Sequence, residues 1–244
     1  MISLPEEKIL YSEIQKKIFY IIPEQWESIY LYASIIDVPN QKPVGEMFFY
    51  YLPKGILKRK FVNGYEIPNI FNIDEEQYSK LITEVYTLIK NLRECFIKKN
   101  KKIWSNISIS IENFQFKAEF GYENLRKLPY GSYERHVIWR FKHLDEDIAA
   151  LSRKDRKIIQ SYAEYIQENP IPKRDMHIEG VYKLPVKNII DFEKTLTVEE
   201  AIAQSEKNVP KEKRKFPLIK KKKEKTEETE EDSDLNNQIL KWKN

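Results

Sequence analysis

The stretch NISISIENFQFKAEFG, residues 106–121, has the clearest alternating pattern in the chain. Isoleucine alternates with small polar residues up to Ile111, and after Glu112–Asn113 phenylalanine or alanine alternates with polar residues up to Phe120. Successive side chains of a strand point to opposite faces, so each run has one apolar and one polar face. Two such runs joined by a tight turn predict a β-hairpin with one dry and one wet face.

Two further strands are expected before this hairpin. In residues 26–36 (WESIYLYASII), aliphatic residues alternate with a second face that carries Trp26, Tyr30 and Tyr32. Residues 46–52 (EMFFYYL) are apolar or aromatic on both faces, which is typical of a strand covered on both sides. The segment between the two strands contains two prolines and is expected to form a hairpin loop.

Three helices are expected around these strands. The first lies between the capping pattern SLPE at residues 3–6 and Pro23. The second begins at the capping pair Asn72 and Glu75, and the third begins at Ser132. The predicted buried stripe of the third helix consists of Tyr133, Val137, Phe141 and Leu144.

The order of these elements predicts three regions in the chain. Residues 1–145 follow the order α-β-β-α-β-β-α, an α+β domain with an antiparallel sheet and helices packed on it. Residues 146–209 are expected to be a helical extension that includes a helix capped at Ser152. Residues 210–244 contain a basic block followed by an acidic block, and such blocks bury too little apolar surface to offset chain entropy. We therefore expect them to be disordered.

Composition favours a cytoplasmic protein that is not inserted in a membrane. Cys95 is the only cysteine, so no disulfide can form within the chain, which suits a reducing compartment. The N-terminus has acidic residues where a signal peptide has basic ones, and the chain has no apolar run long enough to span a bilayer. The net charge of +4 is spread over both halves rather than gathered in one basic domain.

A search for catalytic, metal and cofactor motifs finds none, so we expect no enzyme activity and no cofactor. His136 and His143 are spaced seven residues apart, which is a poor metal pair, and surface histidines are the favoured interpretation. None of the six glycines forms a phosphate-binding pattern. The run Lys220–Lys223 is followed closely by the acidic tract Glu227–Asp234, which would compete with phosphates, so nucleic-acid binding is not expected.

A resemblance to a known family covers residues 9–145. The segments that carry it are IIPEQWESIYLYASI (21–35), EMFFYYLPKG (46–55), IPNIFNIDEEQYSKLITEVYTLIKNLRECF (67–96), WSNISISIENFQFKAEFGYENL (104–125) and YERHVIWRFKHL (133–144). In order and spacing they resemble the YezG-like immunity proteins. The resemblance implies a cytosolic antitoxin that blocks, by direct contact, a cognate toxin of the type VII (LXG) secretion pathway. In one branch that toxin ends in a nuclease domain. No catalytic residues follow from the resemblance.

The predicted toxin contacts lie on the second face of residues 26–36. Trp26, Tyr30 and Tyr32 place rings where polar residues would be normal, and aromatic side chains often anchor interfaces. Trp139 lies off the predicted buried stripe of its helix and is a second candidate. Two alternatives stay open. A helix covering this face would explain the rings structurally, and the chain could instead be an adaptor or regulatory module whose charged tail binds nucleic acid or a protein partner.

Overall fold

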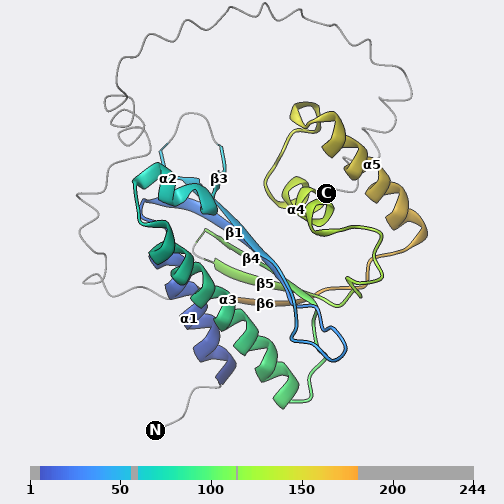
Figure 1. The fold of residues 1–244 in the computed structure, drawn as a ribbon, viewed down its shortest axis with the longest axis horizontal. Coiled ribbons are helices and arrows are strands. Elements are labelled where there is room, and N and C mark those ends of the chain that lie inside the picture. Colours follow the sequence, from blue (N-terminus) through green and yellow to red (C-terminus); the bar gives the residue numbers. More distant parts are fainter. Residues whose placement is uncertain (1–5, 56–59, 114, 181–244) are drawn as a thin grey trace, which may run out of the picture.

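The computed structural model describes residues 6–55, 60–113 and 115–180, which form a six-stranded antiparallel sheet with helices on both faces (Figure 1). The strands lie in the order β3-β2-β1-β4-β5-β6. Their bounds are β1 Trp26–Ser34, β2 Met47–Pro53, β3 Val62–Asn63, β4 Asn106–Glu112, β5 Gln115–Gly121 and β6 Asp175–Gly180. The predicted α+β class, the hairpin over residues 106–121 and the doubly covered strand over residues 46–52 are all confirmed.

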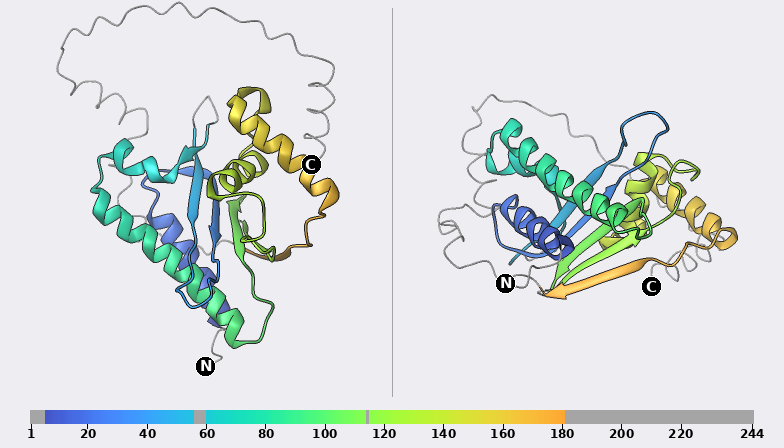
Figure 2. Two further views of the ribbon diagram at one scale, coloured as in Figure 1. Left: turned by 45° about the vertical axis from the view of Figure 1, so that its right-hand side comes forward. Right: turned by 90° about the horizontal axis from the view of Figure 1, so that it is seen from below.

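The first face of the sheet carries the main core under two long helices. These are α1 (Glu6–Tyr20) and α3 (Glu75–Lys98), which pack against each other on one side of the sheet (Figure 2). The short helix α2 (Ile67–Phe71) precedes α3. Fully buried side chains such as Ile14 of α1 and Leu31 of β1 meet in this layer, and each such burial contributes roughly 1.5–3 kcal/mol.

The second face carries α4 (Ser132–His143), with α5 (Arg153–Glu168) packed on it. The indole Nε1 of Trp139 donates a hydrogen bond to the hydroxyl of Ser108 on β4, 3.0 Å away. Ser108 is consequently buried, and Asn106 at the start of β4 is buried as well, although the sequence placed both on a wet face. The expectation of one dry and one wet face for the hairpin is therefore wrong at the end that α4 covers.

Two local details differ from the expected helices. Helix α3 is capped by Asp74, whose carboxylate accepts from the Gln77 backbone N–H, whereas Asn72 has a φ of 51° and ends α2 in the left-handed region. In α4, Tyr133 is 46% exposed while Trp139 is only 5% exposed, so the predicted stripe of that helix is wrong at both residues.

Residues beyond 145 continue the same layers. The predicted cap of α5 is confirmed, since the Ser152 hydroxyl accepts from the Asp155 backbone N–H. The chain then returns as β6, a strand that was not expected, and pairs antiparallel with β5. In Figure 1, β6 lies along the edge of the sheet opposite β3. The rest of the expected helical extension, from residue 181 to 209, and the tail 210–244 lie outside the described residues.

Candidate functional site

The four predicted contact residues do not share one surface. Trp26 lies on the first face, because a β-bulge between Trp26 and Ser28 adds one residue and shifts the alternation. Its ring packs against Phe19 of α1, with the ring centroids 5.1 Å apart. The expectation that Trp26 shares a face with Tyr30 and Tyr32 is therefore wrong.

Tyr32 and Trp139 are buried between α4 and the sheet. Each is 5% exposed, and the Phe48 ring contacts both, with centroid distances of 4.8 Å to Tyr32 and 5.1 Å to Trp139. The alternative considered from the sequence, a helix that covers this face, is confirmed at these positions. The two rings hold α4 on the sheet.

The histidines of α4 belong to the same contact. His136 stacks on Phe48 at 4.1 Å, and its Nε2 is 2.9 Å from the Tyr50 hydroxyl. Burial, with a contribution from nearby Arg140, lowers the pKa of His136 to about 4. Burial and the neighbouring Lys142 lower the pKa of His143 to about 3. The interpretation of both as surface histidines is thus wrong, and both are held neutral.

Tyr30 differs from its neighbours because it lies at the border of the area that α4 covers. Its side chain is half-buried, and its hydroxyl donates to Glu112 Oε2 at 3.1 Å. The Tyr30 ring also meets Phe61 edge-on, with centroids 5.5 Å apart. Burial, together with the Glu112 carboxylate, raises the pKa of Tyr30 to about 12, so the phenol stays protonated and able to donate.

The pairing of β1, β4, β5 and β6 places one residue of each strand in a row across the sheet that begins at Tyr30. Tyr30 lies opposite Ser110, Ser110 opposite Lys117, and Lys117 opposite Ile178. Directly opposed side chains lie on one face with Cβ atoms about 5 Å apart. Tyr30, Ser110 and Lys117 are half-buried, and Ile178 is 51% exposed. We call these residues, Tyr30, Ser110, Lys117 and Ile178, the open row.

The neighbouring row, closer to α4, combines charges with an exposed apolar side chain. In it Ser108 lies opposite Glu119, and Glu119 opposite Met176, which is 60% exposed. Lys117 Nζ lies 2.6 Å from Glu119 Oε1. Burial of Glu119 acts to raise its pKa, but Lys117 outweighs this and keeps the pKa below the usual value. The part of the second face that no described helix covers therefore presents paired charges beside Met176 and Ile178.

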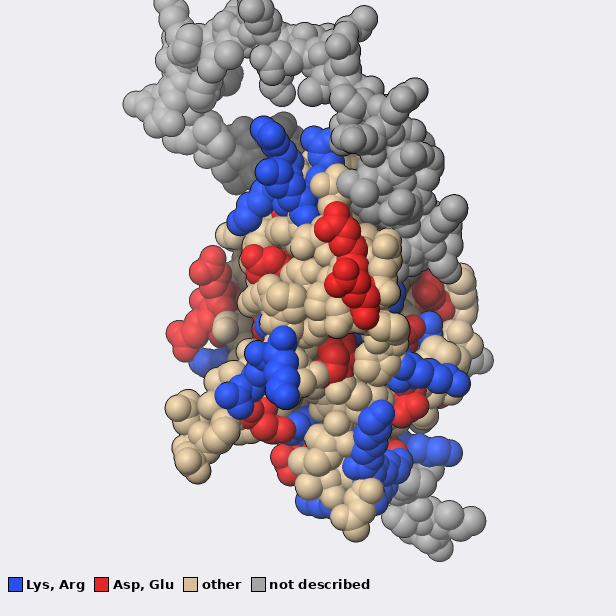
Figure 3. Space-filling model, turned by 90° about the vertical axis from the view of Figure 1, so that its right-hand side faces the viewer, with Lys and Arg blue, Asp and Glu red and all other residues tan. Residues whose placement is uncertain are grey.

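Charges of both signs surround this part of the molecule. Figure 3 looks onto the side with α4 and α5, and basic and acidic side chains are interspersed there around uncharged stretches. This side has no single dominant sign of charge. Recognition of a partner here would depend on shape and on individual contacts more than on a general attraction.

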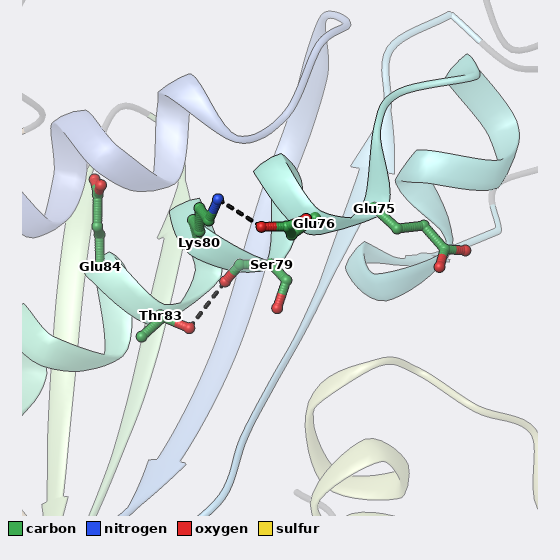
Figure 4. A pocket seen from close by; sticks show the side chains of 6 residues that line it. All are labelled: Glu75, Glu76, Ser79, Lys80, Thr83 and Glu84. Carbon is green, nitrogen blue, oxygen red and sulfur yellow. Dashed lines mark hydrogen bonds and ion pairs between the residues drawn. The ribbon is translucent and has the colours of Figure 1, made fainter.

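A shallow hollow on the other side of the molecule offers no comparable site. Its lining comes from one helix, the first turns of α3 (Figure 4). Lys80 pairs with Glu76 at 2.7 Å, and Thr83 donates to the Ser79 carbonyl, so these groups satisfy one another. The lining residues are Glu75, Glu76, Ser79, Lys80, Thr83 and Glu84. Among the described residues no group of three or more potential metal ligands gathers, and no described helix could cross a membrane.

Comparison with known proteins decides the family. The sequence profile described as "Immunity protein YezG-like" matches residues 8–160. The chain belongs to the YezG-like immunity protein family. Its family relatives include the Immunity protein YezG of Bacillus spizizenii (strain ATCC 23059 / NRRL B-14472 / W23), at 30% identity over 68% of this chain and 96% of the relative. The resemblance expected from the sequence is confirmed.

Two other relatives define the breadth of the family. Immunity protein YezG of Bacillus subtilis (strain 168) is 26% identical over 63% of this chain and 96% of its own length. The Type VII secretion system protein EsaG of Staphylococcus aureus (strain NCTC 8325 / PS 47) is 26% identical over 56% of this chain and 82% of its own length. The YezG-like match ends within α5, so β6 and its two exposed apolar side chains lie beyond it.

The strand β6 was not predicted from the sequence. Met176 and Ile178 alternate with His177 and Glu179, which is a strand pattern, but the run is short and follows two prolines. Only pairing with β5, more than fifty residues earlier, makes it a strand. Lys117 was predicted on the correct strand, and its relation to Tyr30 follows from the register of β1, β4 and β5.

Proposed function

We propose that this chain neutralises a cognate secreted toxin by binding it directly, in the cytoplasm and without catalysing a reaction. Membership of the YezG-like immunity protein family carries this proposal. The arrangement of the second face supports the proposal, because α4 covers only part of the sheet. The part that α4 does not cover carries an aromatic ring, paired charges and apolar side chains. Interfaces commonly combine such a core with a polar rim.

We assign the toxin contact to the open row, with Tyr30, at the end of the row next to α4, as its aromatic anchor. Tyr30 keeps access to solvent on the second face, and its ring is already fixed by Phe61 and Glu112. A pre-oriented aromatic side chain loses little conformational entropy on binding, which favours it as an anchor. Tyr32 and Trp139 would contribute indirectly by holding α4 at the border of the site. Trp26 lies on the opposite face and would not touch the same toxin surface.

The toxin class that fits best is a nuclease domain at the end of a protein secreted by the type VII pathway. The similarity to a type VII secretion system protein supports this choice, together with the resemblance to the branch of the family that is paired with such toxins. The mechanism would be steric: the open row covers the active site of the toxin or prevents that site from assembling. The mixed charge of this side requires shape complementarity, rather than mimicry of nucleic acid.

Co-expression with the toxin domain encoded beside this chain tests the proposal. We expect host survival and co-purification with the wild-type chain. Replacement of a true anchor by alanine costs about 2 kcal/mol or more of binding, so Tyr30→Ala should restore killing or weaken the complex at least thirtyfold. Tyr20→Ala is the matched control, because Tyr20 is 57% exposed on α1, away from the open row. Equal behaviour of the two variants would exclude the assigned surface.

A further inference from the structure

Strand β6 ends the sheet with an outer edge that no described strand covers. In the right-hand view of Figure 2 it lies at the border of the molecule, with no described element beyond it. Edge strands commonly carry lysine, proline or a bulge that prevents further pairing. The strand, DMHIEG, contains neither lysine nor proline, and it pairs regularly with β5 along its length. It carries the acidic residues Asp175 and Glu179 but none of those three devices, and it exposes Met176 and Ile178, so among the described residues this edge is only partly protected.

Symmetry limits how the edge could pair with a second copy of the chain. Antiparallel strands related by a twofold axis perpendicular to the sheet must place side chains of the same face opposite one another. The twofold axis then lies next to one residue of β6, and that residue pairs with the same residue of the second copy. An axis beside Ile178 engages the strand from Met176 to Gly180, and an axis beside His177 engages it from Asp175 to Glu179. An axis beside Met176 or Glu179 leaves half of the strand unpaired.

The register centred on Ile178 is chemically complementary. Ile178 would meet the partner's Ile178, and His177 would lie opposite the partner's Glu179 in both halves of the pair. Within one chain Glu179 Oε2 already lies 3.2 Å from His177 Nε2, and Glu179 Oε1 accepts from Gln15 Nε2 at 2.9 Å. The opposed pair would therefore place an imidazole beside a carboxylate that is already hydrogen-bonded, without opposing like charges. Met176 would lie opposite the partner's Gly180, and Gly180 has open space where a Cβ would be. Opposed apolar and complementary polar pairs stabilise neighbouring strands.

The register centred on His177 is unfavourable by comparison. It would bring Asp175 opposite the partner's Glu179 in both halves, and like charges directly opposed destabilise a strand pair. Asp175 also accepts a hydrogen bond from the Tyr122 hydroxyl, which fixes its carboxylate near the strand. Of the two registers that engage most of β6, only the one centred on Ile178 avoids opposing like charges.

We propose that a second copy of this chain pairs antiparallel with β6 in the register centred on Ile178, which joins the two sheets edge to edge. The open rows of the two copies would become continuous through the two Ile178 side chains. This interaction needs no toxin and can be tested without one, so its outcome and that of the proposed function are separable.

Cysteine cross-linking of the full chain tests the register. Ile178→Cys should form a covalent dimer under mild oxidation, because directly opposed strand residues satisfy disulfide geometry. Met176→Cys is the matched control on the same face, and alone it should not cross-link. A mixture of Met176→Cys and Gly180→Cys proteins should yield the mixed dimer. Native Cys95 is buried and should not contribute. Equal cross-linking of Met176→Cys and Ile178→Cys would overturn the register.

The mass of the unmodified chain in solution tests the pairing itself. Sedimentation should give a dimer that dissociates on dilution, and Ile178→Lys should give a monomer with an unchanged circular dichroism spectrum. Ile9→Lys is the control, because Ile9 is 47% exposed on α1 and Ile178 is 51% exposed on β6. A wild-type chain that stays monomeric up to about 1 mM would overturn the proposal. An Ile178→Lys variant that still forms the dimer would do the same.

Discussion

Trp139 of α4 donates its indole N–H to the hydroxyl of Ser108 on β4, so one hydrogen bond joins the helix to the centre of the sheet. Both residues are 5% exposed. The same ring contacts Phe48, Tyr32 and His143, with centroid distances between 5.0 and 6.2 Å. This contact determines how much of the second face α4 covers, and therefore where the open row begins.

Loss of the Trp139 side chain should strongly destabilise the fold. Trp139→Ala removes a large buried ring and should lower the free energy of unfolding by about 3–5 kcal/mol. Trp139→Phe keeps most of the packing but leaves Ser108 without this donor, and should cost about 1 kcal/mol. Urea denaturation of the two variants measures both values. A loss below about 1 kcal/mol for Trp139→Ala would contradict the assigned role of the ring.

Acid should weaken the contact between α4 and the sheet before it protonates most carboxylates. The folded chain holds the pKa of His136 at about 4 and that of His143 at about 3, whereas an unfolded histidine titrates near about 6.5. The unfolded state therefore binds more protons below pH 6.5, and the free energy of unfolding should fall as the pH decreases from about 6.5 toward 4. Denaturation curves across this range measure the slope.

Replacement of the histidines provides the control for that slope. His143→Gln and His136→Gln should each make stability less dependent on pH between about 6.5 and 4, because neither amide titrates there. Glu119, whose folded pKa lies below its usual value, contributes stability that is lost only at lower pH. An unchanged slope in the double variant would show that other groups cause the dependence.

The buried guanidinium of Arg93 should be a second point of stability. Its Nε donates to the Trp104 carbonyl at 2.9 Å, and its other nitrogens bind Asp37 at 2.5 and 3.2 Å. Arg93→Ala removes these charge-assisted bonds and leaves the Trp104 carbonyl without its donor, so it should cost about 2 kcal/mol or more. Asp37→Asn should cost less, since the Asp37 side chain is 67% exposed. Thermal denaturation compares them, and equal losses would contradict this ranking.

The elements that were predicted correctly are those in which buried residues recur at one regular spacing along the sequence. The hairpin over residues 106–121 and the strand over residues 46–52 have contiguous alternation or continuous apolarity, and both are present in the fold. Helix α4 was predicted with the wrong stripe because it is buried on two sides. Phe141 packs toward α5, while Trp139 packs toward the sheet, so no single helical stripe describes it.

The proposed contact site could be predicted only in part for similar reasons. Tyr30 was identified because the alternation of residues places it on the second face. Trp26 was misplaced because the bulge that follows it has no clear signal in the sequence, and this bulge puts Trp26 on the first face. Ile178 joins the open row through pairing with β5, and Tyr32 is covered by a helix more than a hundred residues later. Such long-range packing is not encoded in local periodicity.

Removal of the charged tail should leave neutralisation intact. A chain that ends at residue 208 keeps every described element, including the open row and β6. We expect it to protect the host against the toxin as the full chain does. Loss of protection, with an unchanged circular dichroism spectrum, would favour the alternative in which the tail recruits a partner.

Direct contact through the open row is the proposed means by which the chain inactivates its toxin. The most direct measurement is the activity of the purified toxin domain, encoded beside this chain, titrated with the wild-type chain and with Lys117→Glu. We expect a stable complex and complete inhibition when the wild-type chain is saturating, and a clearly higher inhibitory concentration for Lys117→Glu. Full toxin activity in an excess of folded wild-type chain, with no complex, would contradict it.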